Sequence, residues 1–454
     1  MSSGLLILNL SVSIAIILIC IMALKLNAVV ALVIASLYMG VSCGLGWMET
    51  VNLIGSGFGS TMTSMGVSII FGVIIGELLS KSGGANVIAE TMIRVFPKDK
   101  SLYALAVTAF ILSIPVFFDI TFIILIPIGL SISKKIKKNI AYIVGDIAIG
   151  GCTAHVLVPP TPNPLAAPSI FGYDLGIQLI GGLILGLISM VVVMKIYHFI
   201  LDKGFFKDSD IDESAVIEIQ DTSNENAPEF WKAMLPIILP LVCILLGTFG
   251  NMLFEESPLL FKLLGSRLPA LLVGVLAAYI VCYKAIGKKD LDAVGNNALK
   301  ASGIAAFVTA AGGAFGSVIG ATNIGSILVE KMGISGTSGG IVLMLVGFVI
   351  AFIFKVAQGS GTVAGITSMQ IMAGFAGGMS IHPFFLAVAC LSGGMGPGHL
   401  NDSAFWVTAN LSGLKVSGGL KTYTTSQMIC AFVIFAFALI LALVLPIPAT
   451  WGLV

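Results

Sequence analysis

The sequence repeats one unusual passage, once in each half of the chain. Residues 76–92 read GELLSKSGGANVIAETM and residues 316–332 read GSVIGATNIGSILVEKM, with glycine, glutamate and methionine at equivalent positions. Later, GGCTAH ends at His155 and GGMGPGH ends at His399, and a polar, helix-breaking run follows each. In a hydrophobic chain, related halves that are interrupted at matching places are typical of a secondary transporter with its binding site at the interruptions. The sequence therefore predicts two repeats that share one site.

The composition is that of a membrane protein. Hydrophobic residues make up 57% of the 454 residues and mean hydropathy is +1.07. Charged residues are only 10%, against about 25% in a soluble domain. No soluble core of this length could bury so much apolar surface, so a polytopic, all-α membrane protein is expected. The first apolar stretch, 5–24, lacks a basic leader and a cleavage site, and is expected to be a retained span.

Charge and cysteine content narrow the possible partners. The net charge of +1 gives no reason to expect a nucleic-acid partner. The seven cysteines lie within apolar segments at irregular spacing, so neither a disulfide framework nor a metal cluster is predicted. No metal or other cofactor is therefore expected.

Apolar runs long enough to span a bilayer, which takes roughly 20 residues, recur along the whole chain. They fall near 4–24, 28–47, 57–80, 140–168, 177–200, 233–254, 268–286, 300–322, 383–411 and 424–447. Two further apolar stretches, 101–133 and 336–379, fit badly, because polar or helix-breaking residues interrupt them. As one helix the first would be about 50 Å long, well beyond the ~30 Å hydrocarbon core. Each is therefore predicted to be a re-entrant helical hairpin; the alternative for the first is one long tilted helix.

Basic residues predict the orientation of the chain. Arg94 and several lysines precede the hairpin 101–133, and KKIKK (134–138) follows it. The positive-inside rule places both ends of this hairpin in the cytoplasm. The second hairpin has few charged neighbours, as expected if it opens to the opposite face.

Two halves of inverted topology follow from this orientation. The first repeat is assigned to 1–201, with a broken helix at 140–168, and the second to 233–454, with a broken helix at 383–411. The polar, mixed-charge run 202–232 between them is expected to be a cytoplasmic linker. Each half has five transmembrane segments and one hairpin, and the odd number of crossings inverts the second half.

The interruptions carry the candidate binding residues. At membrane depth, irregular backbone is tolerated only where protein or a water-filled cavity satisfies it. VPPTPNP (158–164) and LNDS (400–403) free carbonyls and open new helix N-termini, whose N–H groups and positive dipole ends suit a carboxylate. With the hairpin tips they are predicted to form one polar pocket between the repeats. The candidate substrate-binding residues are Asp119, His155, Thr161, Asn163, Gln358, Ser360, Thr362, His399, Asn401 and Asp402.

Each candidate also has a structural alternative. Asp119 lies among phenylalanines, where an ionisable group is costly and usually functional, but it could pair with Lys355 or cap the hairpin. The two histidines could be helix-capping or hydrogen-bonding residues, and residues 401–403 could be an N-cap for the next half-helix. Lys355 could neutralise Asp119, bind an anion or extend to the membrane surface, and the sequence does not rank these roles.

The chain is poor in arginine: Arg94 and Arg267 are the only two, and neither belongs to a predicted break. A bidentate arginine clamp for a di- or tricarboxylate is therefore lacking. This favours a monocarboxylate with hydroxyl groups, held by helix dipoles and by Asn, Ser and Thr side chains.

At these residues the chain resembles the gluconate permease family, a branch of the ion transporter superfamily. The matching stretches are SGGA (82–85), IPVFFD (114–119), AHVLVPPTPNPLAA (154–167), QGSGTVA (358–364) and GHLNDSAFW (398–406), and the likeness covers nearly the whole chain. The resemblance implies proton-coupled import of gluconate or a related sugar acid, with some relatives carrying D-serine. It also implies a homodimer in the bacterial cytoplasmic (inner) membrane. The hairpins and broken helices would then move as a transport unit against a scaffold, which is an elevator mechanism.

Departures from the family pattern fall within the predicted pocket. Sequences most like dedicated gluconate carriers tend to have Glu where Asp119 stands, and His and Gly where Thr161 and Asn163 stand. These differences bear on which acid is carried and leave hydroxy-acid transport as the implied function.

The sequence thus predicts a proton-coupled symporter, not an enzyme, that carries gluconate or a related small hydroxylated monocarboxylate by alternating access. Its partners would be the organic anion, protons and the lipid bilayer. Burial near the membrane centre disfavours ionised carboxylates at neutral pH, so buried acids suit proton coupling. The candidate proton carriers are Asp119, Asp402, His155 and His399.

Other functions remain as alternatives. Sodium coupling is one, since unwound carbonyls beside Asn, Ser and Asp also suit Na⁺, and a D-serine or hydroxy-amino-acid permease is another. A channel would need a continuous polar pore lining, whereas the polar groups cluster at discrete breaks. An intramembrane enzyme would need a nucleophile elbow, a nucleotide loop or a metal-ligand pair at helical spacing, and the sequence has none of these patterns.

Overall fold

The computed structural model describes residues 3–97, 100–212, 226–254, 258–322, 336–376 and 381–445. Within these residues the regular secondary structure is helical, apart from one isolated bridge between Ile211 and Leu414. In the same part of the chain, nine helical segments are long and apolar enough to cross a membrane. The prediction of an all-α polytopic membrane protein is confirmed.

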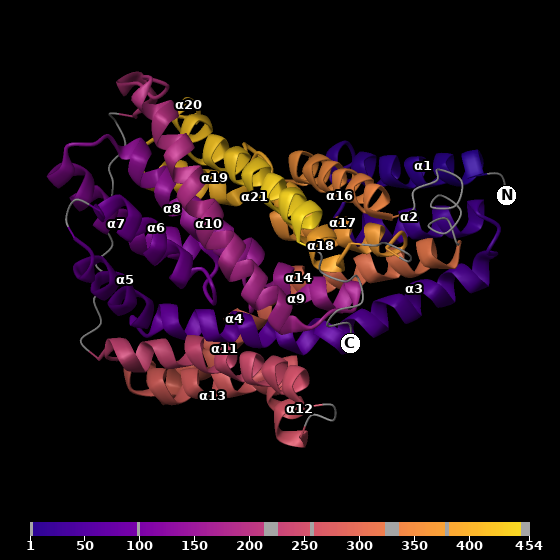
Figure 1. Ribbon diagram of the computed structural model, residues 1–454, viewed down its shortest axis with the longest axis horizontal. Helices are drawn as coiled ribbons and strands as arrows, with labels where there is room; N and C mark the ends of the chain where they lie inside the picture. Colours follow the sequence, from indigo (N-terminus) through magenta and orange to yellow (C-terminus); the bar gives the residue numbers. More distant parts are fainter. Residues whose placement is uncertain are drawn as a thin grey trace.

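The first half of the chain contains α1 to α10 (Figure 1). The helices are α1 (Ser3–Met22), α2 (Ala28–Ser42), α3 (Trp47–Thr61), the π-helical turn η1 (Met62–Gly66), α4 (Val67–Lys81), α5 (Gly84–Val95), α6 (Ser101–Leu112), α7 (Phe118–Ile136), α8 (Ile140–Leu157), α9 (Pro162–Phe171) and α10 (Leu175–Asp202). α3, η1 and α4 form one helical run of 35 residues. At about 52 Å, this run is far longer than a bilayer core is thick.

The second half contains α11 to α21. Its elements are η3 (Asp208–Asp210), α11 (Phe230–Leu253), α12 (Leu259–Gly265), α13 (Arg267–Ile286), α14 (Lys288–Ala321), α16 (Gly336–Gln358), α17 (Gly361–Ala373), α18 (Pro383–Met395), α19 (Ser403–Leu411), α20 (Val416–Gly419), the π-helical turn η4 (Leu420–Thr424) and α21 (Thr425–Val444). α14 is a run of 34 residues, nearly the length of α3 to α4. The repeated passage begins in α4 and in α14, but most of its second copy, 323–332, lies outside the described residues.

Two helix–turn–helix pairs occupy the stretches assigned to hairpins. α6 and α7 are joined by 113–117, where Pro115 interrupts the helical pattern, and the Ser113 hydroxyl contacts that of Thr121 at 3.1 Å across the turn. α16 and α17 are joined at Gly359 and Ser360, and Gly359 adopts φ +82°, a left-handed conformation that suits glycine. α16 has 23 residues and counts among the nine potential spans, whereas α17 has only 13.

Two further helices are broken near their middle. α8 ends at Leu157 because Pro159 and Pro160 cannot donate backbone hydrogen bonds, and α9 begins again after Thr161. α18 ends at Met395, and α19 begins after Asp402, whose Oδ1 accepts a hydrogen bond from the Ala404 N–H at 3.0 Å. This is an N-cap, the alternative that the sequence had left open for this segment.

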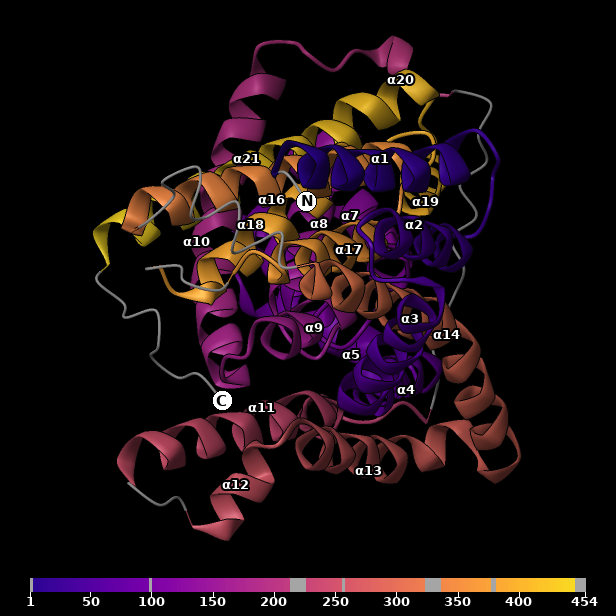
Figure 2. The ribbon, with the colours of Figure 1, turned by 90° about the vertical axis from the view of Figure 1, so that its right-hand side faces the viewer.

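The broken helices form the centre of the molecule. In the most apolar 18-residue stretch of the α8–α9 segment, 94% of the residues are buried, against 28% in that of α1. α8 packs against α6, α7, α10 and α21, while α18 packs against α16, α17 and α21. α11 and α13 lie side by side along one edge, next to α4 (Figures 1 and 2).

α4 approaches the interrupted segments through two glycines. A Cβ on Gly76 would lie 2.4 Å from the carbonyl oxygen of Pro115 in the first hairpin turn. A Cβ on Gly72 would lie 2.6 Å from the carbonyl oxygen of Pro160 in the first helix break. Only glycine therefore allows this backbone-to-backbone contact.

The start of the predicted linker is attached to the second half of the chain. Asp210, in η3, pairs with Lys421 at 2.7 Å, and its carbonyl accepts the Lys415 N–H at 2.9 Å. The Asp212 N–H donates to the Gly413 carbonyl at 2.9 Å. Residues 213–225 of the predicted linker lie outside the described residues.

Candidate functional site

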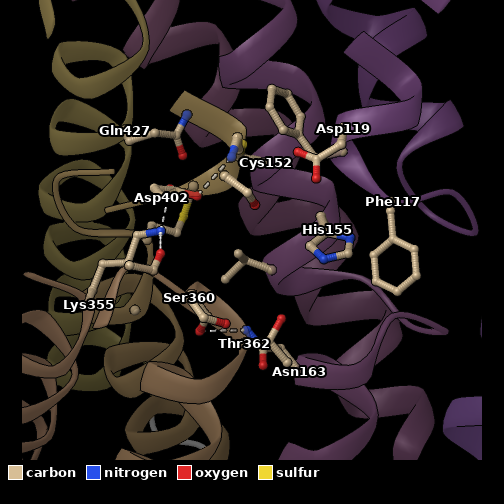
Figure 3. Close-up of a pocket in the computed structure, with 18 of the residues that line it drawn as sticks. Phe117, Asp119, Cys152, His155, Asn163, Lys355, Ser360, Thr362, Asp402 and Gln427 are labelled. Carbon is tan, nitrogen blue, oxygen red and sulfur yellow. Dashed lines mark hydrogen bonds and ion pairs between the residues drawn. The ribbon is translucent and has the colours of Figure 1, made fainter. Parts of the chain in front are cut away.

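Both helix–turn–helix tips and both helix breaks contribute residues to one cavity of about 320 Å³. Figure 3 shows side chains from the first half of the chain facing side chains from the second half across this space. The cavity is lined by seven of the ten predicted binding residues, namely Asp119, His155, Asn163, Ser360, Thr362, Asn401 and Asp402. Sequence positions separated by more than 280 residues are thus brought together at the interruptions.

The N-termini of four helices meet at the cavity. First-turn residues of α7, α9, α17 and α19 line it: Asp119, Asn163, Thr362 and Ser403, respectively. Each N-terminus presents the positive end of a helix dipole. Backbone N–H groups of the first turn accompany it, except at Pro162 and Pro164 of α9, which have none. α7 packs against α19 and α9 against α17, so each hairpin is in contact with a broken helix of the other half. The arrangement favours an anion.

One ion pair lies at the cavity wall. Lys355, near the end of α16, donates to Oδ2 of Asp402 at 2.6 Å and to the carbonyl of Gly359. Lys355 and Asp402 are only 4% and 6% exposed, so this is a buried pair. The hydroxyl of Tyr423, in the π-helical turn η4, donates to the same Oδ2 at 3.0 Å. Lys355 therefore pairs with Asp402, and not with Asp119.

Asp119 lies on the opposite wall, beside His155 (Figure 3). It stands in the first turn of α7, where the helix dipole stabilises a carboxylate. It lies within electrostatic reach of both Lys355 and Asp402, but it accepts no hydrogen bond from the described residues. The ring of Phe118 next to it stacks on Tyr423 at 5.8 Å between centroids, which connects the first hairpin to η4.

Two buried polar atoms of the cavity residues have no hydrogen-bond partner in the described part of the chain. They are Nδ1 of His155 and Oδ1 of Asn163. Asn163 uses its amide nitrogen to donate to the Gly361 carbonyl at 3.3 Å, which joins α9 to α17. Because buried polar atoms are normally satisfied, these two are available to a polar ligand.

Two of the predicted residues do not line the cavity, and the side chain of a third is not described. Thr161 is the N-cap residue of α9, and its hydroxyl donates to the His155 carbonyl at 2.7 Å. His399 lies in the loop between α18 and α19, where its carbonyl accepts the Asp402 N–H at 2.8 Å. Gln358 is the last residue of α16, and its side chain lies outside the described part of the structure.

Other cavity residues were not among the predicted ten. Lys355 was noted without a role, and Cys152, Tyr423 and Gln427 were missed. Tyr423 and Gln427 lie in the polar run KTYTTSQ (421–427) at the start of the predicted span 424–447, and this run was the available signal. Among the described residues no group of three His, Cys, Asp or Glu side chains is placed to hold a metal ion.

Comparison with known proteins identifies the family. Over residues 5–444 the sequence matches the family model described as GntP family permease. The gluconate permease of Pseudomonas aeruginosa is 28% identical over 427 residues, which cover 93% of this chain and 94% of that protein. The Gnt-II system L-idonate transporter of Escherichia coli is 25% identical over 420 residues, covering 91% and 94%.

A solved structure shares the fold. MtrF of Neisseria gonorrhoeae, described as illuminating a class of antimetabolite efflux pumps, is 14% identical and superposes with a TM-score of 0.62. The superposition covers 89% of this chain and 86% of MtrF, so the likeness extends over the whole arrangement of helices. The family match spans nearly the entire sequence, and the chain belongs to the GntP permease family of membrane-spanning transporters.

Proposed function

We propose that the protein is a proton-coupled symporter that imports gluconate or a related small hydroxylated monocarboxylate, and that the cavity is its substrate site. The observation that carries this proposal is the meeting of four helix N-termini at one buried space. In transporters, broken helices at the midplane direct such N-termini at anionic groups of the substrate. The two relatives named above, for gluconate and for L-idonate, are both permeases for sugar acids.

The polar atoms around the cavity fit a substrate with several hydroxyl groups. Nδ1 of His155 and Oδ1 of Asn163 are free to bind hydroxyls, and Ser360 and Thr362 add hydroxyl groups from the second hairpin. The volume of about 320 Å³ lies at the lower end of small-molecule sites. A compact, polar organic acid suits this space.

Proton coupling is supported by Asp119. An ionisable side chain at membrane depth is costly, and here it faces the cavity without a hydrogen bond from the described residues. Protonation removes that cost and the repulsion between Asp119 and an entering anion. A carboxylate that binds a proton as the substrate enters is the simplest link between proton binding and substrate binding.

The proposal also covers the membrane location, the oligomeric state and the way the chain moves during transport. We place the protein in the bacterial cytoplasmic membrane as a homodimer of chains with two inverted repeats, 1–201 and 233–454, joined by the cytoplasmic linker 202–232. The helix–turn–helix pairs and broken helices would move together as an elevator-type transport unit. The glycine contacts of α4 with Pro115 and Pro160 place α4 directly against both a hairpin turn and a helix break of this unit.

The test is uptake by purified protein in proteoliposomes. D-gluconate, L-idonate, glycerate and D-serine are each supplied with an inward proton gradient, a sodium gradient or neither. We expect concentrative uptake of a sugar acid that requires the proton gradient. Uptake that requires sodium instead would replace proton coupling with sodium coupling, and uptake of none of the four under any gradient would reject the proposed substrate class.

Asp119→Asn tests the coupling residue. We expect at least tenfold lower accumulation under the proton gradient, because the neutral side chain can no longer bind and release a proton. Asp208→Asn, at an exposed aspartate of η3, is the matched control and should accumulate substrate normally. Full pH-driven accumulation by Asp119→Asn would show that another group carries the proton.

A further inference from the structure

Lys355 has one more donor than the structure uses. It is the only lysine or arginine among the described residues that line the cavity. Its ammonium group carries three N–H donors, and two of them bond to Asp402 and Gly359. The third has no acceptor in the described part of the chain, so a buried cation at the cavity wall retains free binding capacity.

Asp402 holds Lys355 but is itself committed on both oxygens. Oδ1 caps α19 through the Ala404 N–H, while Oδ2 accepts from Lys355 and from the Tyr423 hydroxyl. The lysine therefore shares Oδ2 with a second donor. If the lysine left, Tyr423 would still bind that oxygen, and the N-cap of α19 would not be disturbed.

The charges of the cavity do not suit an anion as they stand. The groups that face the pair are Asp119 from α7, Cys152 and His155 from α8, and Tyr423 from η4. With both carboxylates ionised, one ammonium opposes two negative charges, and an entering monoanion adds a third. Burying uncompensated charge is strongly unfavourable, and two protons, one on Asp119 and one on Asp402, balance the charges when the anion binds.

We infer that Lys355 binds the carboxylate of the substrate, and that it exchanges Asp402 for the substrate when Asp402 takes up a proton. This inference rests on the proposed function. A proton from the aqueous side adds to the Asp402 carboxylate and gives the neutral acid. Lys355 keeps all three of its protons and transfers its ion pair to the substrate carboxylate. On release, the substrate departs, the proton leaves Asp402 and the original ion pair forms again.

The exchange explains how one site couples two ligands. Without the proton, Asp402 competes with the substrate for Lys355, and without the substrate, the protonated acid leaves the ammonium unpaired in a buried site. Each ligand therefore favours the binding of the other, which is a reciprocal coupling. The site needs no arginine, in agreement with the scarcity of arginine in the chain.

A purely structural ion pair is the competing explanation, and a double substitution separates the two. Removing either partner alone leaves a buried charge without its partner, whereas Lys355→Gln with Asp402→Asn removes both. A structural pair predicts that the double variant recovers stability and substrate binding together. The exchange predicts that it recovers stability while binding stays lost.

The experiment measures equilibrium binding of radiolabelled D-gluconate to the purified full-length protein at pH 6 and pH 8. For the wild type we expect tighter binding at pH 6, and a clear preference for gluconate over its neutral amide. Lys355→Gln should weaken gluconate binding at least about 30-fold, as expected for loss of one partner of a buried charge pair, and should reduce the preference over the amide to what the helix N-termini provide. In the Asp119→Asn background, which removes the other carboxylate of the cavity, Asp402→Asn should bind gluconate equally at both pH values.

Lys421→Gln is the matched control, because it removes a lysine–aspartate pair of similar length outside the cavity. Its gluconate affinity and pH dependence should match the wild type. The inference is overturned if the double variant Lys355→Gln with Asp402→Asn binds gluconate within threefold of the wild type. It is also overturned if adding Asp402→Asn to Asp119→Asn leaves the pH dependence of Asp119→Asn unchanged. A wild type that binds no gluconate and transports none of the four acids would instead reject the proposed function, so the two failures are distinguishable.

Discussion

Asp402 and Asp210 are both buried aspartates that pair with a lysine, in different surroundings. Asp402 meets Lys355 beside the cavity, whereas Asp210 meets Lys421 where the chain leaves α10 for the second half. Burial alone would raise the pKa of Asp210, but hydrogen bonds from Lys421 and from the Lys207 backbone hold it below its usual value of 3.8. The pair of Asp402 and Lys355 faces the cavity that is proposed to bind an anion. The pair of Asp210 and Lys421 attaches the start of the linker to the second half of the chain.

Asp210→Asn should lower the thermal unfolding midpoint of the purified protein at pH 7. The lost charge-assisted hydrogen bonds correspond to about 1–3 kcal/mol. Because the folded pKa lies below the unfolded one, the stabilisation is present above pH 3.8 and is lost as pH falls through the lower folded value. The difference from wild type should thus persist from pH 7 to pH 5 and shrink towards pH 3.5. Exposed Asp208→Asn serves as control; a difference that grows on acidification would contradict the assignment.

At the scale of residues, the sequence predicted which side chains line the cavity better than it predicted their ion-pair and hydrogen-bond partners. Asp119, Asp402 and Asn163 could be recognised because a polar side chain within an apolar segment is costly and usually functional. The pairing of Lys355 with Asp402 was not predictable, because it depends on how the end of α16 meets a loop 47 positions further along the chain. Tyr423 was missed because only the π-helical turn η4 directs it to the cavity, and no composition signal marks such a turn.

At the scale of elements, proline and glycine determine where helices stop. The interruptions at 113–117, 158–161 and 359–360 coincide with Pro115, Pro159 and Gly359, and for this reason they could be predicted. Helix length was harder to predict. α16 continues through the stretch assigned to one hairpin arm and is long enough to span, since it contains no proline and the helix continues through Gly347.

Gly76→Ala should reduce transport at least tenfold. The new methyl group would meet the Pro115 carbonyl, which is backbone and cannot rotate away, so α4 and the hairpin turn must separate. Overpacking of this kind typically costs about 1–3 kcal/mol. Gly59→Ala, in the same helical run with open space around its Cβ, is the control and should retain transport. The measurement is initial uptake rate per folded protein; equal rates for both variants would show that the contact is not needed.

At the scale of the molecule, two long helical runs stand in equivalent places. Trp47–Lys81 and Lys288–Ala321 have 35 and 34 residues, and each holds the start of the repeated passage. α14 packs against both α3 and α4, so the two runs lie together within one layer. The repeat was visible in the sequence, and the inverted orientation of its copies stays a prediction that rests on the positive-inside rule.

Accessibility of introduced cysteines tests that orientation. Glu49→Cys and Lys289→Cys place exposed thiols at the starts of α3 and α14. Inverted repeats require the first to react with a membrane-impermeant maleimide on intact cells, and the second only after permeabilisation. The wild type, whose seven cysteines are free and mostly buried, gives the background. Labelling of both sites from the same side would exclude inversion.

The meeting of four helix N-termini also bears on how such a protein can change its substrate. Exchange of one side chain for another, proline excepted, leaves the peptide dipoles of α7, α9, α17 and α19 in place. Under the proposed function, exchanges at Asn163 would alter which pattern of hydroxyls fits, while the attraction for a carboxylate would be kept. Laboratory selection for other organic acids would therefore best begin at this position.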